Sequence, residues 1–392
     1  MKKVKIKEIA EQIRGVSYTP ADAFDTFSED TIPLLRANNI QNSTVNYNDL
    51  VYVRADKVGQ KQLLNINDIL ICASSGSKHL VGKACVIKEE YGTFGAFCKV
   101  LRPNSKMINP AYFSHYFQSA IYRKTISELA AGANINNIKN EHLDELAIAL
   151  PNMPTQEGIA RKLDAICRLI TLREQQLKKL DQLASSRFIE MFGDPIANPK
   201  SWTTGKLSEV TDKIGSGATP QGGKESYITS GISLIRSMNI HNGKFEYKDL
   251  AHITEEQAQQ LNNVNVKSKD VFINITGASV ARSCVVPDDV LPARVNQHVS
   301  IIRCKQNILN PIFANSLFIS LPYQRTLLAI GESGGATRQA ITKQQLENLM
   351  IILPSLELQN EFSAFVEQLD KSKVIGEKQR FMLEKITCYD IL

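Results

Sequence analysis

The chain has 392 residues, of which 43% are hydrophobic and 22% are charged, and its formal net charge is +6. This length exceeds one ordinary compact core and suits two domains of roughly 150 residues each. No stretch reaches the ~18 consecutive apolar residues of a membrane span, and alternating charged and aliphatic residues, not an apolar signal-peptide core, follow the N-terminal lysines. We therefore expect a soluble protein that stays in the cytoplasm.

The seven cysteines are scattered along the chain and include no C-x-x-C pair, which argues against a disulfide framework and against a zinc site. Most have aliphatic neighbours, as in Ile71-Cys72-Ala73, and are predicted to be reduced core residues. The mild basic excess suits a polyanionic partner but is equally common among soluble enzymes. Composition alone therefore leaves the class of function open.

The two halves of the chain correspond when the sequence is shifted by about 200 residues. Thr19-Pro20 matches Thr219-Pro220, and the residues around Arg36 recur around Arg236. The matches continue through each half: Tyr47 to Leu50 with Tyr247 to Leu250, Asp68 to Ile71 with Asp270 to Ile273, Cys85-Val86 with Cys284-Val285, Asn109-Pro110 with Asn310-Pro311, Gly132-Ala133 with Gly335-Ala336, and Leu150-Pro151 with Leu353-Pro354. A correspondence of this length indicates an internal duplication.

Each half begins with a loop-rich α/β domain, which we place at residues 1–154 and 193–354. In the second half, β-branched and aliphatic runs bounded by turn residues predict strands over 270–276, 283–286, 299–303 and 349–353.

A long amphipathic helix is predicted after each domain, over residues 155–192 and 355–392. Along the first helix, apolar residues recur at spacings of four and three with Arg173 as a polar interruption, and Gly193-Asp194-Pro195 ends it. Its length of about 55 Å is too great for one small domain. The stripes comprise Ile159, Leu163, Ile166, Ile170, Leu177, Leu180, Ala184 and Met191 in the first helix, and Phe362, Val366, Leu369, Leu383 and Ile386 in the second, where Ser372, Lys373 and Gly376 weaken the middle.

These elements predict an α+β fold with two tandem α/β domains separated by long helices. The helices most simply bury their stripes against each other as an antiparallel coiled coil, which relates the two domains by a pseudo-twofold axis. Alternatively, each helix packs on its own domain, which would leave much of its length unsupported.

The sequence contains no recognisable catalytic motif. The segment from Gly217 to Lys224 resembles a phosphate-binding loop, but Ala218 stands where a glycine is needed and Glu225 replaces the magnesium-binding Ser or Thr. The six histidines are isolated, so their spacing indicates neither a metal site nor a base paired with a nucleophile.

The loops instead carry amide, hydroxyl and basic side chains, which suit base edges and phosphate oxygens. Each residue taken alone is more simply a solvated loop residue, but their duplication favours DNA binding. The candidates are Thr19, Arg36, Asn38, Ser75, Lys78, Lys83, Asn134 and Asn136 in the first half, and Thr219, Lys224, Arg236, Asn239, Thr276, Ser279, Arg282, Arg294, Gln297, His298 and Arg338 in the second. Two such readers would face half-sites about 34 Å apart, and their different sequences predict an asymmetric target.

Several motifs, taken in order, resemble the specificity subunit of type I restriction-modification systems. They are Gly217 to Pro220, Ile232 to Ile240, Asp270 to Gly277, Asn296 to Val299, and Gly335 to Thr337 followed by Leu353-Pro354. The first half departs from the pattern, because Ser17 to Pro20 lacks the usual glycines and Gly95 to Cys98 stands where Asn-Gln-His is found in the second half.

The resemblance implies two target recognition domains, helices that act as a molecular ruler, and no catalysis, cofactor or metal in this chain. It also implies double-stranded DNA, two modification subunits and two restriction subunits as partners. The modification subunits would bind S-adenosylmethionine and methylate adenine, and the restriction subunits would use ATP and magnesium.

Two alternatives remain at this point. A self-contained methyltransferase or nuclease would bind S-adenosylmethionine or cleave DNA without partner subunits. A duplicated module for protein or sugar on a coiled-coil scaffold would lack the steep salt dependence of phosphate-driven binding.

Overall fold

The computed structural model describes residues 2–77, 80–129, 136–220, 222–332 and 339–388. The chain forms two compact units: residues 1–174 with 377–392, and residues 175–376. We call these the first unit and the second unit. Each unit contains one α/β domain together with part of each long helix.

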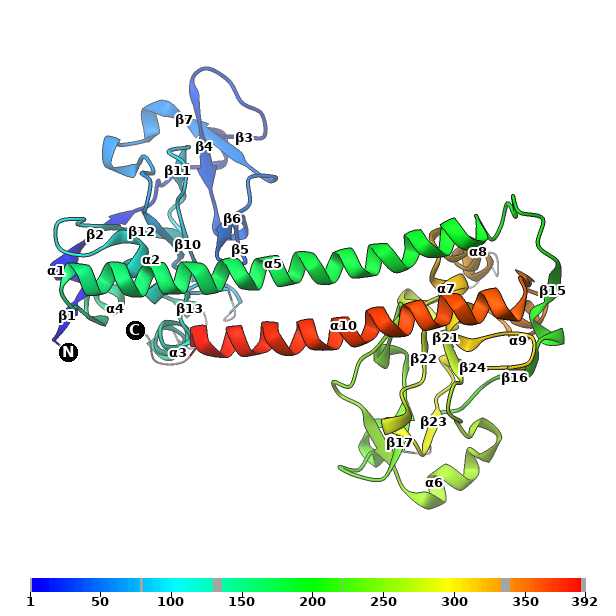
Figure 1. The fold of residues 1–392 in the computed structure, drawn as a ribbon. Coiled ribbons are helices and arrows are strands. Elements are labelled where there is room, and N and C mark those ends of the chain that lie inside the picture. Colours follow the sequence, from blue (N-terminus) through cyan, green and yellow to red (C-terminus); the bar gives the residue numbers. More distant parts are fainter. Residues whose placement is uncertain (1, 78–79, 130–135, 221, 333–338, 389–392) are drawn as a thin grey trace. The chain divides into compact units, whose positions relative to one another are not determined.

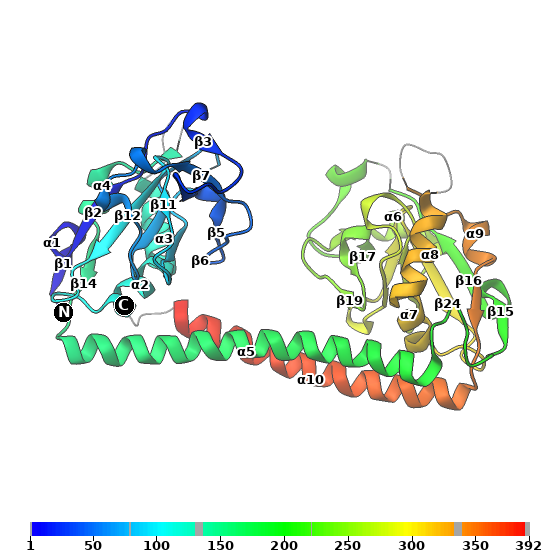
Figure 2. The same ribbon diagram turned by 90° about the horizontal axis from the view of Figure 1, so that it is seen from above.

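The first unit is built around two four-stranded sheets. One is antiparallel, with the order β10 (Ala84–Val86), β8 (Ile69–Cys72), β12 (Cys98–Pro103) and β2 (Ala10–Arg14), and Figure 2 shows β12 beside β2. In the other, β11 (Thr93–Phe94) runs parallel to β4 (Thr31–Leu35), which pairs with β7 (Val51–Arg54) and β7 with β3 (Ala23–Phe24). The smaller strand pairs are β1 (Lys3–Lys5) with β14 (Ala147–Ala149), β5 (Ile40–Gln41) with β6 (Thr44–Val45), and β9 (Ser74–Ser75) with β13 (Asn136–Asn137). The helices of this domain are α1 (Ile6–Ile9), α2 (Pro110–Gln118), α3 (Ala120–Leu129) and α4 (Asn140–Asp144).

The second unit repeats this arrangement. Its antiparallel sheet has the order β16 (Thr211–Ser216), β24 (Val299–Cys304), β21 (Val271–Asn274) and β22 (Ser283–Val285). In a three-stranded sheet, β17 (Ile232–Ile235) lies between antiparallel β20 (Ala251–Ile253) and parallel β23 (Ala293–Val295). The smaller pairs are β15 (Thr204–Lys206) with β25 (Met350–Ile352) and β18 (Ile240–His241) with β19 (Lys244–Phe245), and the helices are α6 (Glu255–Gln260), α7 (Pro311–Ile319), α8 (Leu321–Glu332) and α9 (Lys343–Glu347). The four predicted strands of this half are confirmed as β21, β22, β24 and β25.

The central strands are buried on both faces, which explains why they are continuously apolar rather than alternating. In β21, Val271 and Ile273 belong to the core beneath α7 and α8, whereas Phe272 belongs to the core shared with the three-stranded sheet. In the first unit, Ile69 and Ile71 of β8 face one core and Leu70 faces the other. In β21 the one polar residue, Asn274, stands at the end of the strand.

A buried ion pair is repeated in both units. Arg303 Nε and Nη2 donate to Asp270 Oδ1 and Oδ2 at 2.8 and 2.7 Å, and Arg102 makes the same two bonds to Asp68 at 2.9 and 2.8 Å. Both carboxylates are 1% exposed. This bidentate geometry joins the residue before β21 to strand β24, and the residue before β8 to strand β12.

The two long helices are α5 (Met153–Phe192) and α10 (Leu356–Cys388). Each begins next to a glutamine whose side chain binds the globular domain: Gln156 Oε1 accepts a hydrogen bond from Asn109 N, and Gln359 Oε1 accepts one from Asn310 N. Both glutamines are buried and both amides also donate to a proline carbonyl, that of Pro151 or Pro354. The start of each helix is therefore fastened to its own domain.

Contacts within each unit show that α5 and α10 run antiparallel. In the second unit, the ring centroids of Phe188 and Phe362 are 5.6 Å apart and Lys373 Nζ lies 2.9 Å from Asp181 Oδ1. In the first unit, Arg380 Nη1 lies 3.4 Å from Glu174 Oε1. Figure 1 shows the end of α5 beside α7, where Phe188 and Phe192 also pack on Phe313.

The predicted apolar stripe of α5 is confirmed, because all of its members are buried or half-buried. On α10, Phe362, Val366, Leu369 and Leu383 are buried or half-buried, but Ile386 is exposed. Lys373 and Gly376 do not interrupt this helix. A Cβ atom at Gly376 would lie 3.1 Å from Leu177 Cδ2, so the glycine allows close packing in the seam.

Candidate nucleic-acid interface

Four loops of the second unit emerge at one end of its sheets. Strands β16 and β21 both pair antiparallel with β24, so their carboxyl ends flank the start of β24. Strand β17 runs parallel to β23, so the loops after both strands leave in the same direction. Main-chain bonds join these loops: Asn296 N donates to Ile235 O, Gly217 N to Asn296 O, and Ile275 N to His298 O.

One of these close approaches requires a glycine. A Cβ atom at Gly217 would lie 1.8 Å from Val295 O. The loop before Thr219 can therefore reach the loop after β23 only because position 217 has no side chain.

A hydrogen-bonded network of four predicted residues lies where these loops meet. The Thr219 hydroxyl donates to Gln297 Oε1, Gln297 Nε2 contacts His298 Nε2 at 3.2 Å, and the Thr276 hydroxyl contacts His298 Nδ1. Because an amide nitrogen can only donate, we assign His298 as neutral with its proton on Nδ1. Gln297 then retains one N–H and one oxygen lone pair on an exposed side chain. The network thus holds a donor and an acceptor in a fixed orientation.

Basic side chains lie in the adjoining loops. Arg282 is half-exposed and forms no ion pair with any described residue, so its charge is available to a phosphate. Arg236 lies 5.4 Å from the centroid of the Tyr227 ring and donates to Asp249 O. Ser279 is half-exposed and ends a 3₁₀ turn that starts at Gly277.

Two predicted DNA-contacting residues are internal braces instead. Arg294 is 7% exposed and donates to Ala258 O, Asn262 Oδ1 and Asn265 Oδ1 at 3.0–3.1 Å. Asn239 is fully buried, accepts from Arg236 N and donates to Glu246 O. Their polar groups are used within the domain, which argues against the prediction that these two side chains touch DNA.

The first unit has loops at equivalent places. Arg36 Nη2 lies 3.2 Å from Asp49 Oδ2, which also accepts from Asn38 Nδ2. The Thr19 hydroxyl donates to Asp22 Oδ2 at 2.7 Å, and Ser75 Oγ accepts from Ser77 N at 3.2 Å. Lys83 is half-buried beside β8. Lys78, Asn134 and Arg338 lie outside the described residues, as do the side chains of Asn136 and Lys224.

Matching main-chain bonds align residues 95–97 with residues 296–298. Phe97 O accepts from Ala73 N as His298 O accepts from Ile275 N, at 2.8 and 2.9 Å. The remaining matched pairs are Gly95 N to Leu35 O with Asn296 N to Ile235 O, and Cys98 N to Gly95 O with Val299 N to Asn296 O. Ala96 and Phe97 therefore occupy the positions of Gln297 and His298. Sequence reasoning missed Phe97, which is 71% exposed, because it sought polar side chains alone.

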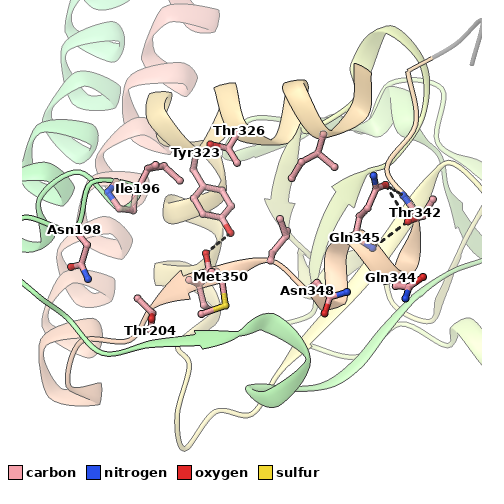
Figure 3. Close-up of a pocket in the computed structure, with 14 residues that line it drawn as sticks. Ile196, Asn198, Thr204, Tyr323, Thr326, Thr342, Gln344, Gln345, Asn348 and Met350 are labelled. Atoms are coloured by element: carbon pink, nitrogen blue, oxygen red, sulfur yellow. Dashed lines mark hydrogen bonds between the residues drawn. The ribbon is translucent and has the colours of Figure 1, made fainter. Parts of the chain in front are cut away.

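A groove of about 690 Å³ in the second unit lies apart from these loops, between α8, α9, β25 and residues 195–204 (Figure 3). Its lining contains no acidic or basic side chain, no histidine and no cysteine. Tyr323 donates its hydroxyl to Met350 O at 3.1 Å, and burial raises the pKa of this phenol. The groove therefore offers no acid–base pair. Within the described ranges, no three acidic, histidine or cysteine side chains gather as a metal site would need, and no helix is long and apolar enough to cross a membrane.

The model of the type I restriction modification DNA specificity domain matches residues 1–182 and, a second time, residues 199–382. The chain belongs to this family. It is 27% identical to the EcoKI specificity subunit of Escherichia coli K12 over 390 residues, which cover 93% of this chain and 81% of that subunit. It is 40% identical to the StySPI specificity subunit of Salmonella potsdam over 179 residues, but this match spans only 38% of that relative and 45% of this chain.

A solved structure supports the same fold. The S subunit of the type I restriction-modification system from M. genitalium matches with a TM-score of 0.58 at 15% identity, over 98% of this chain and 93% of that one. The resemblance seen in the sequence and the α+β fold with two tandem domains are thus confirmed. The family serves DNA recognition, and the chain is a specificity subunit rather than an enzyme.

Proposed function

We propose that each unit reads one half of a bipartite, asymmetric DNA target. The observation that carries this proposal is the repeated set of convergent loops, which share main-chain geometry between the units but differ in exposed side chains. Gln297 and His298 in the second unit replace Ala96 and Phe97 in the first. Readers that share a scaffold and differ in contact chemistry would recognise different half-sites.

The side chains of the second unit divide by the chemistry they offer. Gln297 presents the donor and acceptor pair that suits a base edge in the major groove. Arg282 and Ser279 suit phosphate oxygens, which position a protein without reading sequence. In this assignment Thr219, Thr276 and His298 act by orienting Gln297.

We further propose that α5 and α10 set the spacing between the half-sites. A helix of the 40 residues in α5 is about 60 Å long, which is of the order of one to two turns of B-form DNA. The contacts between α5 and α10 within each unit, and the two buried glutamines at the helix starts, support this proposal.

The same helices carry exposed apolar side chains that suit a docked protein. In the first unit these are Leu169, Leu172, Phe381 and Met382, each between 48% and 66% exposed. Apolar side chains concentrated on a helix surface mark protein interaction sites. We propose that modification subunits dock here.

The complete enzyme in this proposal contains two modification subunits that use S-adenosylmethionine and two restriction subunits that use ATP and magnesium. This chain then contributes recognition and assembly without binding a cofactor. We place the complex in the cytoplasm, in keeping with the unpaired cysteines of the described residues.

Exchange of one domain tests the proposal. Residues 204–352 would be replaced by the matching segment of another family member, and methylated sites would be mapped by methylome sequencing in cells that contain the modification subunits. We expect one half of the methylated motif to change and the other to stay. A change in both halves or in neither would refute the division of labour.

Two measurements address the alternatives. Detection of S-adenosylmethionine binding or DNA cleavage by the purified chain alone would favour a self-contained enzyme. The logarithm of the DNA association constant of the complex should fall linearly with the logarithm of salt concentration. A flat salt dependence would favour a module for protein or sugar.

A further inference from the structure

The two candidate interfaces differ in the two-residue segment before β12 or β24. In the second unit, Gln297 and His298 form a network with Thr219 and Thr276. In the first unit, Ala96 is exposed and Phe97 is 71% exposed, although three main-chain bonds hold their loop in the same place. The same backbone therefore presents a hydrogen-bonding pair in one unit and an apolar pair in the other.

Phe97 is the most exposed aromatic side chain among the described residues of the first unit. The next, Phe27, is 64% exposed, and its ring centroid lies 5.8 Å from that of Tyr52. The carbonyl of Phe97 accepts hydrogen bonds from Ala73 N and Ser74 N at 2.8 and 3.1 Å, which fix the backbone while the ring points away from both cores. An exposed aromatic ring on a fixed backbone, at the loop end that faces the proposed ligand, suits an apolar group on that ligand.

B-form DNA exposes one such group in the major groove, the C5-methyl of thymine. Alanine and phenylalanine offer neither a donor nor an acceptor, so they can discriminate a base only by apolar contact or by shape. We infer that Ala96 and Phe97 contact a thymine methyl group in the first half-site. This inference rests on the proposed function, and it assigns apolar readout to the first unit at the position where the second unit uses hydrogen bonds.

Methyl deletion in the DNA tests the contact directly. The complete complex with its modification subunits would be titrated with duplexes in which each thymine of the first half-site, as mapped by methylome sequencing, is replaced in turn by deoxyuridine. We expect one replacement to weaken specific binding by roughly three- to tenfold, the effect of losing one buried methyl group. In the Phe97→Ala complex, the thymine and deoxyuridine duplexes should bind within about twofold of each other.

Matched variants separate this contact from folding. Met107→Ala removes a side chain that is 44% exposed beyond the opposite end of β12, and this variant should keep the full deoxyuridine effect. Phe97→Leu retains an apolar contact and should keep part of it. Circular dichroism and thermal unfolding of each complex would confirm that Phe97→Ala folds.

The outcomes distinguish the inference from the function beneath it. Absence of specific DNA binding by the wild-type complex would overturn the proposed function. Specific binding that tolerates deoxyuridine at every position of the first half-site would overturn the inference alone, as would a first half-site without thymine on either strand. A deoxyuridine effect that persists unchanged in Phe97→Ala would assign the methyl contact to another residue.

Discussion

Gln297 offers the sharpest test of readout in the second unit. Its exposed carboxamide is oriented by Thr219 on one side and by His298 on the other, which leaves one donor and one acceptor for a base. Replacement by alanine removes both groups and leaves the backbone bonds of the loop intact. Because a good bidentate contact contributes about 1–3 kcal/mol of discrimination, Gln297→Ala should reduce discrimination at one base pair by roughly five- to 150-fold.

The assay uses the complete complex and duplexes that carry each of the four base pairs at each position of the second half-site. Discrimination at one position should fall, while preferences at the other positions and in the first half-site should persist. Gln306→Ala is the matched control, because Gln306 is exposed beyond the far end of β24. A uniform loss of affinity for all sequences, or an altered first half-site, would refute this assignment.

Three further predictions follow from the same structure. Arg303→Met leaves the buried Asp270 carboxylate unpaired and should destabilise the second unit by about 3 kcal/mol. Arg102→Met should destabilise the first unit in the same way. Hydrogen exchange that shows no local loss of protection in these variants would contradict this prediction. Arg282→Ala removes a phosphate contact and should weaken binding evenly across sequences, with the slope of log K against log salt reduced by about 1; a sequence-dependent effect would make Arg282 a base reader. Met382→Glu introduces a charge on the exposed face of α10 and should reduce co-purification of the modification subunit several-fold. Ile66→Glu, at a similarly exposed site outside the helices, should not reduce it. Equal effects of the two changes would argue against docking on the helix.

The duplication carried most of the information about the fold. Repetition of the strand segments and of the apolar stripe led to the two domains and to α5 and α10. Helix α5 begins two residues before its predicted start and ends where predicted, and α10 begins one residue after its predicted start. The predicted end of α10 at residue 392 lies outside the described residues. The prediction that Lys373 and Gly376 weaken the middle of α10 was wrong. Gly376 and Lys373 suit this seam because Leu177 fills the space over the glycine and Asp181 pairs with the lysine, and neither partner could be identified before the helices were aligned.

The candidate site was harder to predict because side-chain chemistry alone does not separate residues that contact DNA from residues that form hydrogen bonds within the domain. Asn239 and its counterpart Asn39 make the same bonds in both units, since each accepts from the arginine three residues earlier and donates to a main-chain carbonyl. At this position, the identical residue in both halves therefore indicates a structural role. Residues that differ between the halves at one backbone position, such as Ala96 and Gln297, are the better candidates for readers.

Arg294 shows the limit of that signal. Its counterpart by strand register is Thr93, which is also buried and donates to Gln62 O. The two halves differ here because their domain interiors differ, and only the burial of the guanidinium reveals it.

The loops before β12 and β24 are held by main-chain bonds that do not depend on the side chains at positions 96, 97, 297 and 298. These four positions can therefore accept new residues without a change in the core. A combinatorial library randomised at these positions should consist mostly of folded proteins, whereas randomising Phe272, buried in β21, should not. The domain core and the four loop positions can therefore be changed independently of each other.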